Sequence, residues 1–120
     1  MKKTVLVIDE EKGLTHLFKK ILENDYVVHT ANSFSEATLL FEEKKEEIDL
    51  VIMEMTMRTM SATDIVLCFQ KIKPKIRFFI VVASFNQKTF ENLSEIGCTG
   101  FLSKPFSGEK FLQEIENAWK

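Results

Sequence analysis

The hydrophobic residues of this chain fall into short runs that alternate with segments of helical period. Five runs rich in β-branched and aromatic residues are predicted to be strands: 4–8, 26–31, 49–53, 77–82 and 100–102. All except 26–31 are apolar without alternation, as expected for parallel strands buried on both faces. This pattern predicts an α/β fold, in which helices cover both faces of one doubly wound sheet.

The segments between these runs have the spacing of amphipathic helices. The first segment carries apolar residues at i, i+3, i+4, i+7 and i+8, which predicts one buried helix face: Leu14, Leu17, Phe18, Ile21 and Leu22. Capping and breaking residues place the other four helices after Ser33, over 63–72, over 87–96 before Gly97, and after Ser107.

Charged residues follow three of the predicted strands: Asp9 and Glu10 after the first, Glu54 after the third, and Lys104 after the fifth. Ligands of doubly wound folds bind beyond the carboxyl ends of the strands, so these side chains are expected to meet. Clustered carboxylates raise one another's pKa unless a cation neutralises them. Mg²⁺ is a suitable cation, because it prefers carboxylate and carbonyl oxygens as ligands. Lys104 would then bind a phosphoryl oxygen or, without one, the carboxylate of Glu54. For Glu11, the simpler reading is a favourable charge before a helix.

Composition narrows the classes of function. The chain has 120 residues, 45% of them hydrophobic and 28% charged, which is typical of one soluble globular domain. A net charge of −2 disfavours direct binding to nucleic acid or to an anionic membrane. Cys68 and Cys98 lack the spacing of a zinc or redox pair and are expected to be free thiols. No apolar run has transmembrane length or the form of a signal peptide, so we expect a cytoplasmic location.

Three segments have a more specific pattern: VLVIDEE at 5–11, DLVIMEMTM at 49–57 and EIGCTGFLSKPF at 95–106. In this order and spacing the chain resembles the receiver domain of two-component response regulators over its whole length. The resemblance implies a single receiver domain over 1–120 with the CheY-like, flavodoxin-like fold of five parallel strands. It also implies a non-enzymatic role in phosphorelay signalling, as acceptor of a phosphoryl group from a histidine kinase or phosphotransfer protein.

The resemblance assigns expected roles to several residues. Asp9 and Glu10 match the acidic pair that holds Mg²⁺ in receivers, with Glu10 as the more direct ligand. Thr56 matches the position that lends a backbone carbonyl to the metal. Lys104 matches the lysine that contacts the phosphoryl group, and it precedes a proline through a bond that receivers commonly hold cis. Phe101 matches the aromatic switch position.

Other positions depart from the family's pattern. Glu54 stands where receivers carry the aspartate that is phosphorylated and that borders the metal. Val82 falls where receivers carry a Thr or Ser that binds the phosphoryl group, and Ser84, two residues along on the same strand face, is the alternative. The extra methylene of Glu54 moves its carboxylate on the order of 1.5 Å into the phosphoryl space, and phosphoryl transfer depends on position. We therefore expect a pseudo-receiver that is not switched by normal aspartyl phosphorylation, with weakened Mg²⁺ binding.

Two alternatives remain open. Glu54 could itself be phosphorylated, with Ser84 supplying the missing hydroxyl. The chain could instead be a small Mg²⁺-dependent phosphatase or a flavin carrier, related to receivers by fold alone. The acidic segment after the first strand lacks a glycine-rich phosphate loop, which disfavours the flavin carrier, whereas Asp9 and Glu11 offer the spacing of a phosphatase weakly.

The resemblance also suggests a partner surface for a homodimer or an effector. It would comprise the predicted helix 87–96, the strand 100–102 and the helix after Ser107. Phe85, Phe90 and Phe101 lie in this region, and exposed aromatic side chains would favour a contact there. The chain ends about where a receiver ends, so a stand-alone receiver and a domain of a longer protein both remain open.

Overall fold

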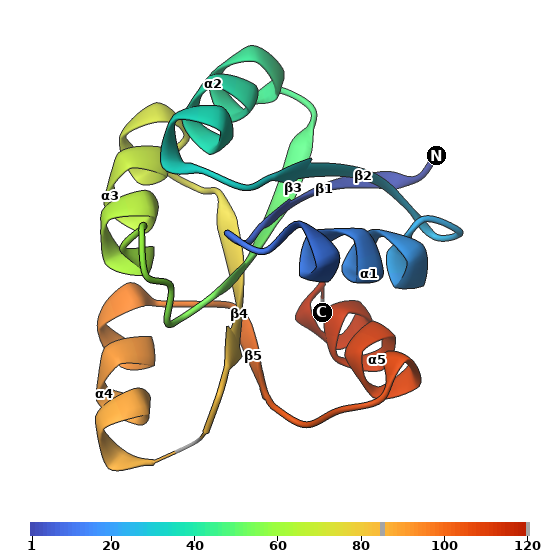
Figure 1. The fold of residues 1–120 in the computed structure, drawn as a ribbon. Coiled ribbons are helices and arrows are strands. Elements are labelled where there is room, and N and C mark those ends of the chain that lie inside the picture. The colour runs from blue at the N-terminus through green and yellow to red at the C-terminus, as the bar shows by residue number, and fades with distance from the viewer. Residues whose placement is uncertain (85, 120) are drawn as a thin grey trace.

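A computed structural model describes residues 1–84 and 86–119, and these form a parallel sheet between two layers of helices (Figure 1). The strands are β1 (Lys3–Ile8), β2 (Tyr26–Ala31), β3 (Ile48–Glu54), β4 (Arg77–Val82) and β5 (Gly100–Ser103). Their order is β2-β1-β3-β4-β5, and all neighbours pair in parallel. The predicted flavodoxin-like fold is therefore confirmed, and the strand order reverses between β1 and β3.

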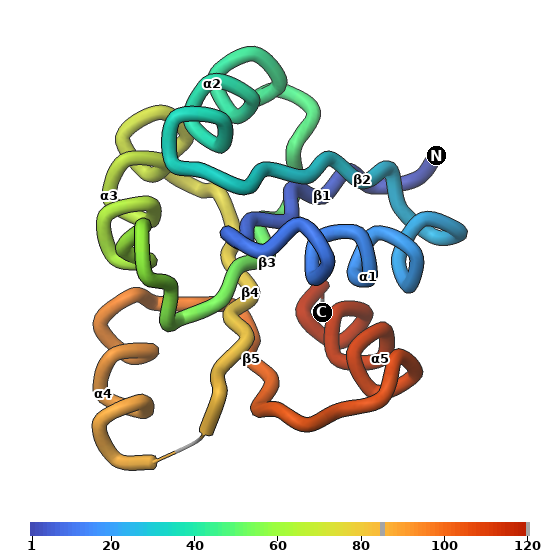
Figure 2. The backbone as a smooth tube through the Cα atoms, viewed as in Figure 1, coloured from blue at the N-terminus to red at the C-terminus, as the bar shows by residue number. Residues whose placement is uncertain are grey.

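Two helices cover one face of the sheet and three cover the other (Figure 1). The first pair is α1 (Lys12–Leu22) and α5 (Gly108–Ala118); the other three are α2 (Phe34–Lys44), α3 (Ala62–Ile72) and α4 (Gln87–Ile96). Figure 2 shows how the chain passes from each strand into a helix and back to the sheet. None of the helices in the described part of the chain is long and apolar enough to cross a membrane.

The helix ends follow the residues that the sequence offers for capping. The hydroxyl groups of Ser33 and Ser107 accept hydrogen bonds from backbone amides in the first turns of α2 and α5, as predicted. Ser61 and Asn86 cap α3 and α4 in the same way. Gly97 ends α4 with φ of 71°, a left-handed conformation that glycine adopts without steric strain.

Side chains on alternating strand positions build two hydrophobic cores. The α2–α4 core lies between the sheet and α2, α3 and α4, where the rings of Phe41 and Phe69 stack with centroids 4.1 Å apart. Cys68 and Cys98, both free, pack against it. The α1–α5 core lies on the opposite face and centres on Phe111. The two cores hold the sheet rigidly from both sides, which fixes the positions of the strand ends.

Exposure at the sheet edge and on α1 differs from the prediction. The run 100–102 was expected to be buried on both faces, but β5 is an edge strand and Phe101 is 40% exposed. Leu17 was assigned to the buried face of its helix, yet it is 50% exposed and lines a groove of about 380 Å³ beside Pro105 and Phe106. Helical periodicity shows which face of a helix is apolar. It does not show how much of that face the neighbouring elements cover.

The stacked pair of Phe41 and Phe69 generates a stability prediction. Phe69→Ala should lower the free energy of unfolding by about 3–5 kcal/mol, because it removes a fully buried ring from the α2–α4 core. Urea denaturation followed by circular dichroism measures this change. Leu67→Ala on the same helix is the matched control, since Leu67 is 55% exposed and its loss should cost less than about 0.5 kcal/mol. Equal losses in both variants would contradict the core assignment.

Candidate functional site

The candidate site lies at the carboxyl edge of the sheet, where the strand order reverses. The parallel pairing continues to the last residues, or nearly so, of four strands: β1, β3, β4 and β5. Asp9 therefore follows β1 beside the end of β3, which is Glu54, and Lys104 follows β5 beside Val82. The sheet thus brings together side chains from distant parts of the sequence. This agrees with the expectation that residues at the carboxyl ends of parallel strands meet at one edge.

Glu54 and Lys104 form a close ion pair through Oε1 and Nζ. The side chain of Glu54 is 15% exposed and that of Lys104 is 35% exposed, so water screens this pair less than it screens a surface pair. The backbone amide of Lys104 donates to the carbonyl of Val82 at 2.9 Å, and the following peptide bond is cis, as expected. The predicted contact between Glu54 and Lys104 is confirmed.

Asp9 is buried between β1, the end of β2 and Glu54, with 1% of its surface exposed. Its Oδ1 accepts a hydrogen bond from the amide of Glu11 at 2.9 Å. Its Oδ2 is buried without a hydrogen-bond partner among the described residues. Burial raises the pKa of Asp9 to about 6, the hydrogen bond from Glu11 opposes this rise, and the neighbouring carboxylate of Glu54 adds to it.

Glu10 points to the loop between β3 and α3. Its carboxylate accepts hydrogen bonds from the amide of Arg58 at 2.6 Å, the amide of Thr59 at 2.8 Å and the hydroxyl of Thr59 at 2.7 Å. These donors, led by the Arg58 amide, lower the pKa of Glu10. Both carboxylate oxygens are thus engaged, and they tie the end of β1 to the loop that follows Glu54.

The three candidate carboxylates do not form a metal centre as they are arranged. Within residues 1–84 and 86–119, no group of three His, Cys, Asp or Glu side chains is placed to hold a metal ion. Glu10 contacts the loop, Glu54 contacts Lys104, and the unpartnered Oδ2 of Asp9 is buried. Mg²⁺ keeps several water molecules and needs near-octahedral geometry, so it does not fit these residues without their rearrangement.

The remaining predicted site residues lie near this edge in different settings. Val82 is buried in the α2–α4 core with 1% exposure. The expectation that Ser84 shares its strand face is wrong, because β4 ends at Val82; Ser84 is exposed in the following loop, where its carbonyl accepts a hydrogen bond from Thr89. Thr56 is exposed and forms an isolated antiparallel bridge with Ser61.

Phe101 lies on β5 and is partly exposed, and it lines the same part of the surface as Phe90 of α4. These two residues line a surface groove of about 340 Å³ together with the end of α4. Phe85, the third aromatic residue predicted for this region, lies outside the described residues. An aromatic groove is therefore present where the sequence led us to expect a partner surface.

Asn32 is a residue of the site that sequence reasoning missed. Its Nδ2 donates to the carbonyl of Asp9 at 2.8 Å and to Oγ1 of Thr15 at 3.1 Å. These bonds connect the end of β2 to the loop after β1 and hold Asp9 in place. The available signal was the position of Asn32 directly after a strand and before the cap Ser33, where a short amide side chain often bonds to nearby backbone.

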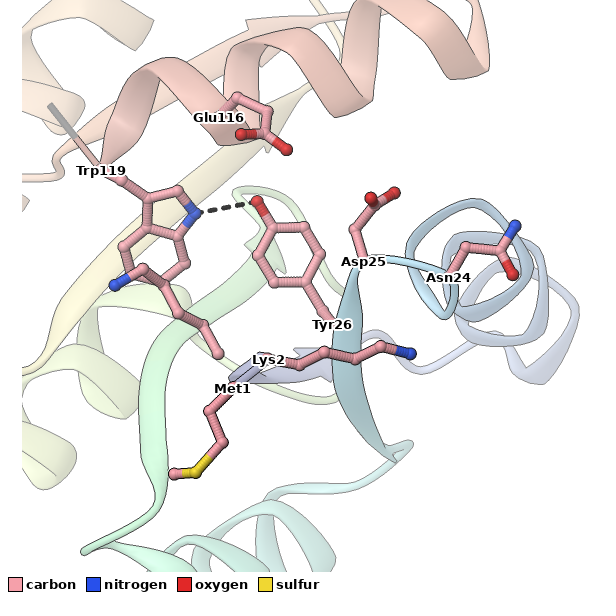
Figure 3. Close-up of a pocket in the computed structure, with 8 residues that line it drawn as sticks. Met1, Lys2, Asn24, Asp25, Tyr26, Glu116 and Trp119 are labelled. Carbon is pink, nitrogen blue, oxygen red and sulfur yellow. Dashed lines mark hydrogen bonds between the residues drawn. The ribbon is translucent and has the colours of Figure 1, made fainter.

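A pocket of about 530 Å³ lies at the opposite edge of the sheet, near the start of β1 and β2 (Figure 3). In it, Nε1 of Trp119 donates to the hydroxyl of Tyr26 at 2.9 Å. Burial raises the pKa of Tyr26, while the bond from Trp119 opposes this. The Nζ of Lys3 lies 4.7 Å from the centroid of the Trp119 ring. These internal contacts hold the end of α5 against β1 and β2. The side chains that line the pocket therefore have a structural role.

Comparison with known proteins gives consistent matches. The family model of the response regulator receiver domain matches residues 5–116. The chain is 31% identical over 105 residues to the sensor kinase CckA of Brucella abortus, covering 87% of this chain and 11% of the kinase. It is 28% identical over 110 residues to the alkaline phosphatase synthesis transcriptional regulatory protein PhoP of Bacillus subtilis, covering 89% of this chain and 44% of that protein. The chain thus spans less than half the length of both relatives.

Among solved structures, the crystal structure of a response regulator receiver domain protein from Clostridium thermocellum is similar over almost the whole chain. Its TM-score is 0.85 at 31% identity, and the match covers 97% of this chain and 93% of the other. Both the sequence and the fold therefore agree with the same family.

Burial of Asp9 generates a prediction of pH dependence. Its pKa lies near 3.8 in the unfolded chain and at about 6 in the folded one, so the folded state holds the proton more tightly. Stability should therefore fall as pH rises from about 4 to 6 and stay lowered above that range. Asp9→Asn removes this penalty and should stabilise the domain by about 1–3 kcal/mol at about pH 8, with a smaller gain at about pH 4.

Urea unfolding at a series of pH values measures this difference. Glu43→Gln, on the exposed surface of α2, is the control for loss of one negative charge and should show no comparable gain. A stability difference between Asp9→Asn and the wild type that does not change with pH would show that the Asp9 carboxyl is not perturbed.

Proposed function

Since the chain belongs to the response regulator receiver domain family, we propose that it is a two-component receiver that is not switched by normal aspartyl phosphorylation. The coarser function, a receiver domain of two-component signalling, follows from family membership. Receivers are typically signalling domains without an enzymatic role of their own. The finer proposal depends on Glu54, for which we propose the position of the phosphorylated aspartate.

The ion pair of Glu54 and Lys104 is the observation that carries the proposal. In a working receiver, the acceptor carboxylate and the lysine must both face an incoming phosphoryl group. Here the longer side chain of Glu54 reaches Lys104 directly, so the two groups neutralise each other across the space where that phosphoryl group would bind. In-line transfer requires accurate placement of the attacking oxygen, and a displacement of about 1 Å lowers the rate by orders of magnitude.

Val82 supports the same proposal independently. A receiver uses a hydroxyl at this position to bind the phosphoryl oxygens and to couple them to its aromatic switch. Val82 has no hydroxyl, and its side chain is buried in the α2–α4 core. Ser84 does not compensate, because it lies in the exposed loop beyond the end of β4. Both changes weaken phosphoryl binding without disturbing the fold.

We propose that the domain signals instead through partner binding. The groove formed by α4 and β5 is the candidate surface, since Phe90 is 52% exposed and Phe101 is 40% exposed. Exposed aromatic side chains at a groove are typical of binding hot spots. By family, a histidine kinase or phosphotransfer protein is the expected upstream partner, and a second copy of the chain or an effector is the expected occupant of this groove.

A phosphodonor experiment tests the proposal. The purified chain is incubated with acetyl phosphate and Mg²⁺, and the intact mass is measured. We expect no phosphoryl adduct in the wild type. Stoichiometric, Mg²⁺-dependent modification at Glu54 would show that the chain is a working receiver with a glutamate acceptor. Glu54→Gln, which has no nucleophilic carboxylate, controls for modification at other residues.

Restoring the family's residues gives a second test. Glu54→Asp shortens the side chain and frees Lys104, so it should gain slow phosphorylation, and adding Val82→Thr should increase the rate by about tenfold or more. Val82→Thr alone should remain unmodified, because the acceptor is still Glu54. If neither the single nor the double variant gains phosphorylation, the loss does not arise from these two positions.

A further inference from the structure

We propose that the ammonium group of Lys104 is the resident cation of this site and replaces the divalent metal, while Glu10 anchors the loop after β3 instead of binding an ion. The inference rests on the proposed function for the role of the site. It concerns metal binding, however, which is measured separately from phosphorylation.

The first step is the charge balance at the sheet edge. Asp9 and Glu54 directly follow the paired residues Ile8 and Met53, so two carboxyl groups lie side by side at this edge and a positive charge beside them is favourable. Lys104 supplies that charge by direct contact with Glu54. A divalent ion would have to displace this ammonium group before it could use the Glu54 carboxylate.

The second step is the position of Lys104. Its amide donates to the carbonyl of Val82, so the backbone from which the side chain extends is part of the sheet. A tethered group has a high effective concentration at its partner, whereas a free ion must be drawn from solution. Mg²⁺ also dehydrates reluctantly, which adds to its disadvantage in a partly buried site. The tethered cation therefore has the advantage at ordinary metal concentrations.

The third step is the use of Glu10. Three donors from Arg58 and Thr59 surround its carboxylate at 2.6–2.8 Å, across 48 and 49 positions of sequence. These hydrogen bonds connect the end of β1 to the loop after β3. A metal ion bound by both segments would make the same connection. To become a metal ligand, Glu10 would have to give up these charge-assisted hydrogen bonds. We infer from these contacts that Glu10 positions the loop after β3 directly, without a metal ion.

Manganese is a suitable probe because it takes the same oxygen ligands as Mg²⁺ and broadens the NMR signals of nearby amides. We expect millimolar Mn²⁺ to cause no selective broadening at the amides of Glu11 and Met55 in the wild type. Lys104→Met leaves Asp9 and Glu54 without their cation, so Mn²⁺ should now bind there about tenfold more tightly or better. Lys104→Arg keeps the charge and should not bind Mn²⁺.

Lys110→Met is the matched control, since it removes a lysine from another ion pair, with Glu114 on α5 at 3.0 Å. It should behave like the wild type. Adding Glu10→Gln to Lys104→Met should leave the gained Mn²⁺ affinity unchanged but speed hydrogen exchange at the amides of Arg58 and Thr59. Lys104→Gln serves as the test variant if Lys104→Met does not fold, as judged by its amide spectrum.

Three results would overturn the inference. The first is selective Mn²⁺ binding by the wild type as tight as that of Lys104→Met. The second is no gain of binding in a folded Lys104 variant that lacks the charge. The third is loss of the gained binding on Glu10→Gln, which would make Glu10 a ligand. Wild-type binding of Mn²⁺ without phosphorylation would contradict this inference alone, whereas metal-independent phosphorylation would contradict the proposed function alone.

Discussion

The ion pair between Glu54 and Lys104 is the interaction on which the properties of this site depend. It joins the end of β3 to the residue after β5, although β4 lies between these two strands. Its two groups are partly withdrawn from water, so their mutual attraction is stronger than that of an exposed pair. In this position the ammonium group of Lys104 balances one of the carboxylates that the strand ends bring together. In the proposed function, the pair also occupies the space that a receiver keeps for a phosphoryl group.

The rest of the fold supports this pair. The α2–α4 core and the α1–α5 core hold the sheet from both faces, and the parallel register places the strand ends at one edge. Asn32 fixes the segment around Asp9, and Glu10 fixes the loop after Glu54. The receiver fold is therefore kept, while Glu54 and Glu10 make internal contacts at its carboxyl edge.

Much of the structure could be predicted from the sequence, because its signals are local. Apolar runs gave the strands, cap residues such as Ser33 and Ser107 gave the helix starts, and Gly97 gave the end of α4. The meeting of Glu54 with Lys104 was also predictable, since strand ends of a doubly wound sheet converge. The exposure of Leu17 and Phe101 and the loop contacts of Glu10 were not, because they depend on which segments lie opposite in space.

A crystal structure of the wild-type chain grown with millimolar Mg²⁺ and beryllofluoride, a phosphoryl mimic, tests the central claim most directly. If the internal ion pair closes the site, Nζ of Lys104 will still contact the Glu54 carboxylate, Glu10 will still contact the Arg58 and Thr59 amides, and neither metal nor beryllofluoride will be bound. Beryllofluoride bonded to Glu54, with Mg²⁺ beside Asp9 and Glu10 and Lys104 turned to the fluorides, would contradict it.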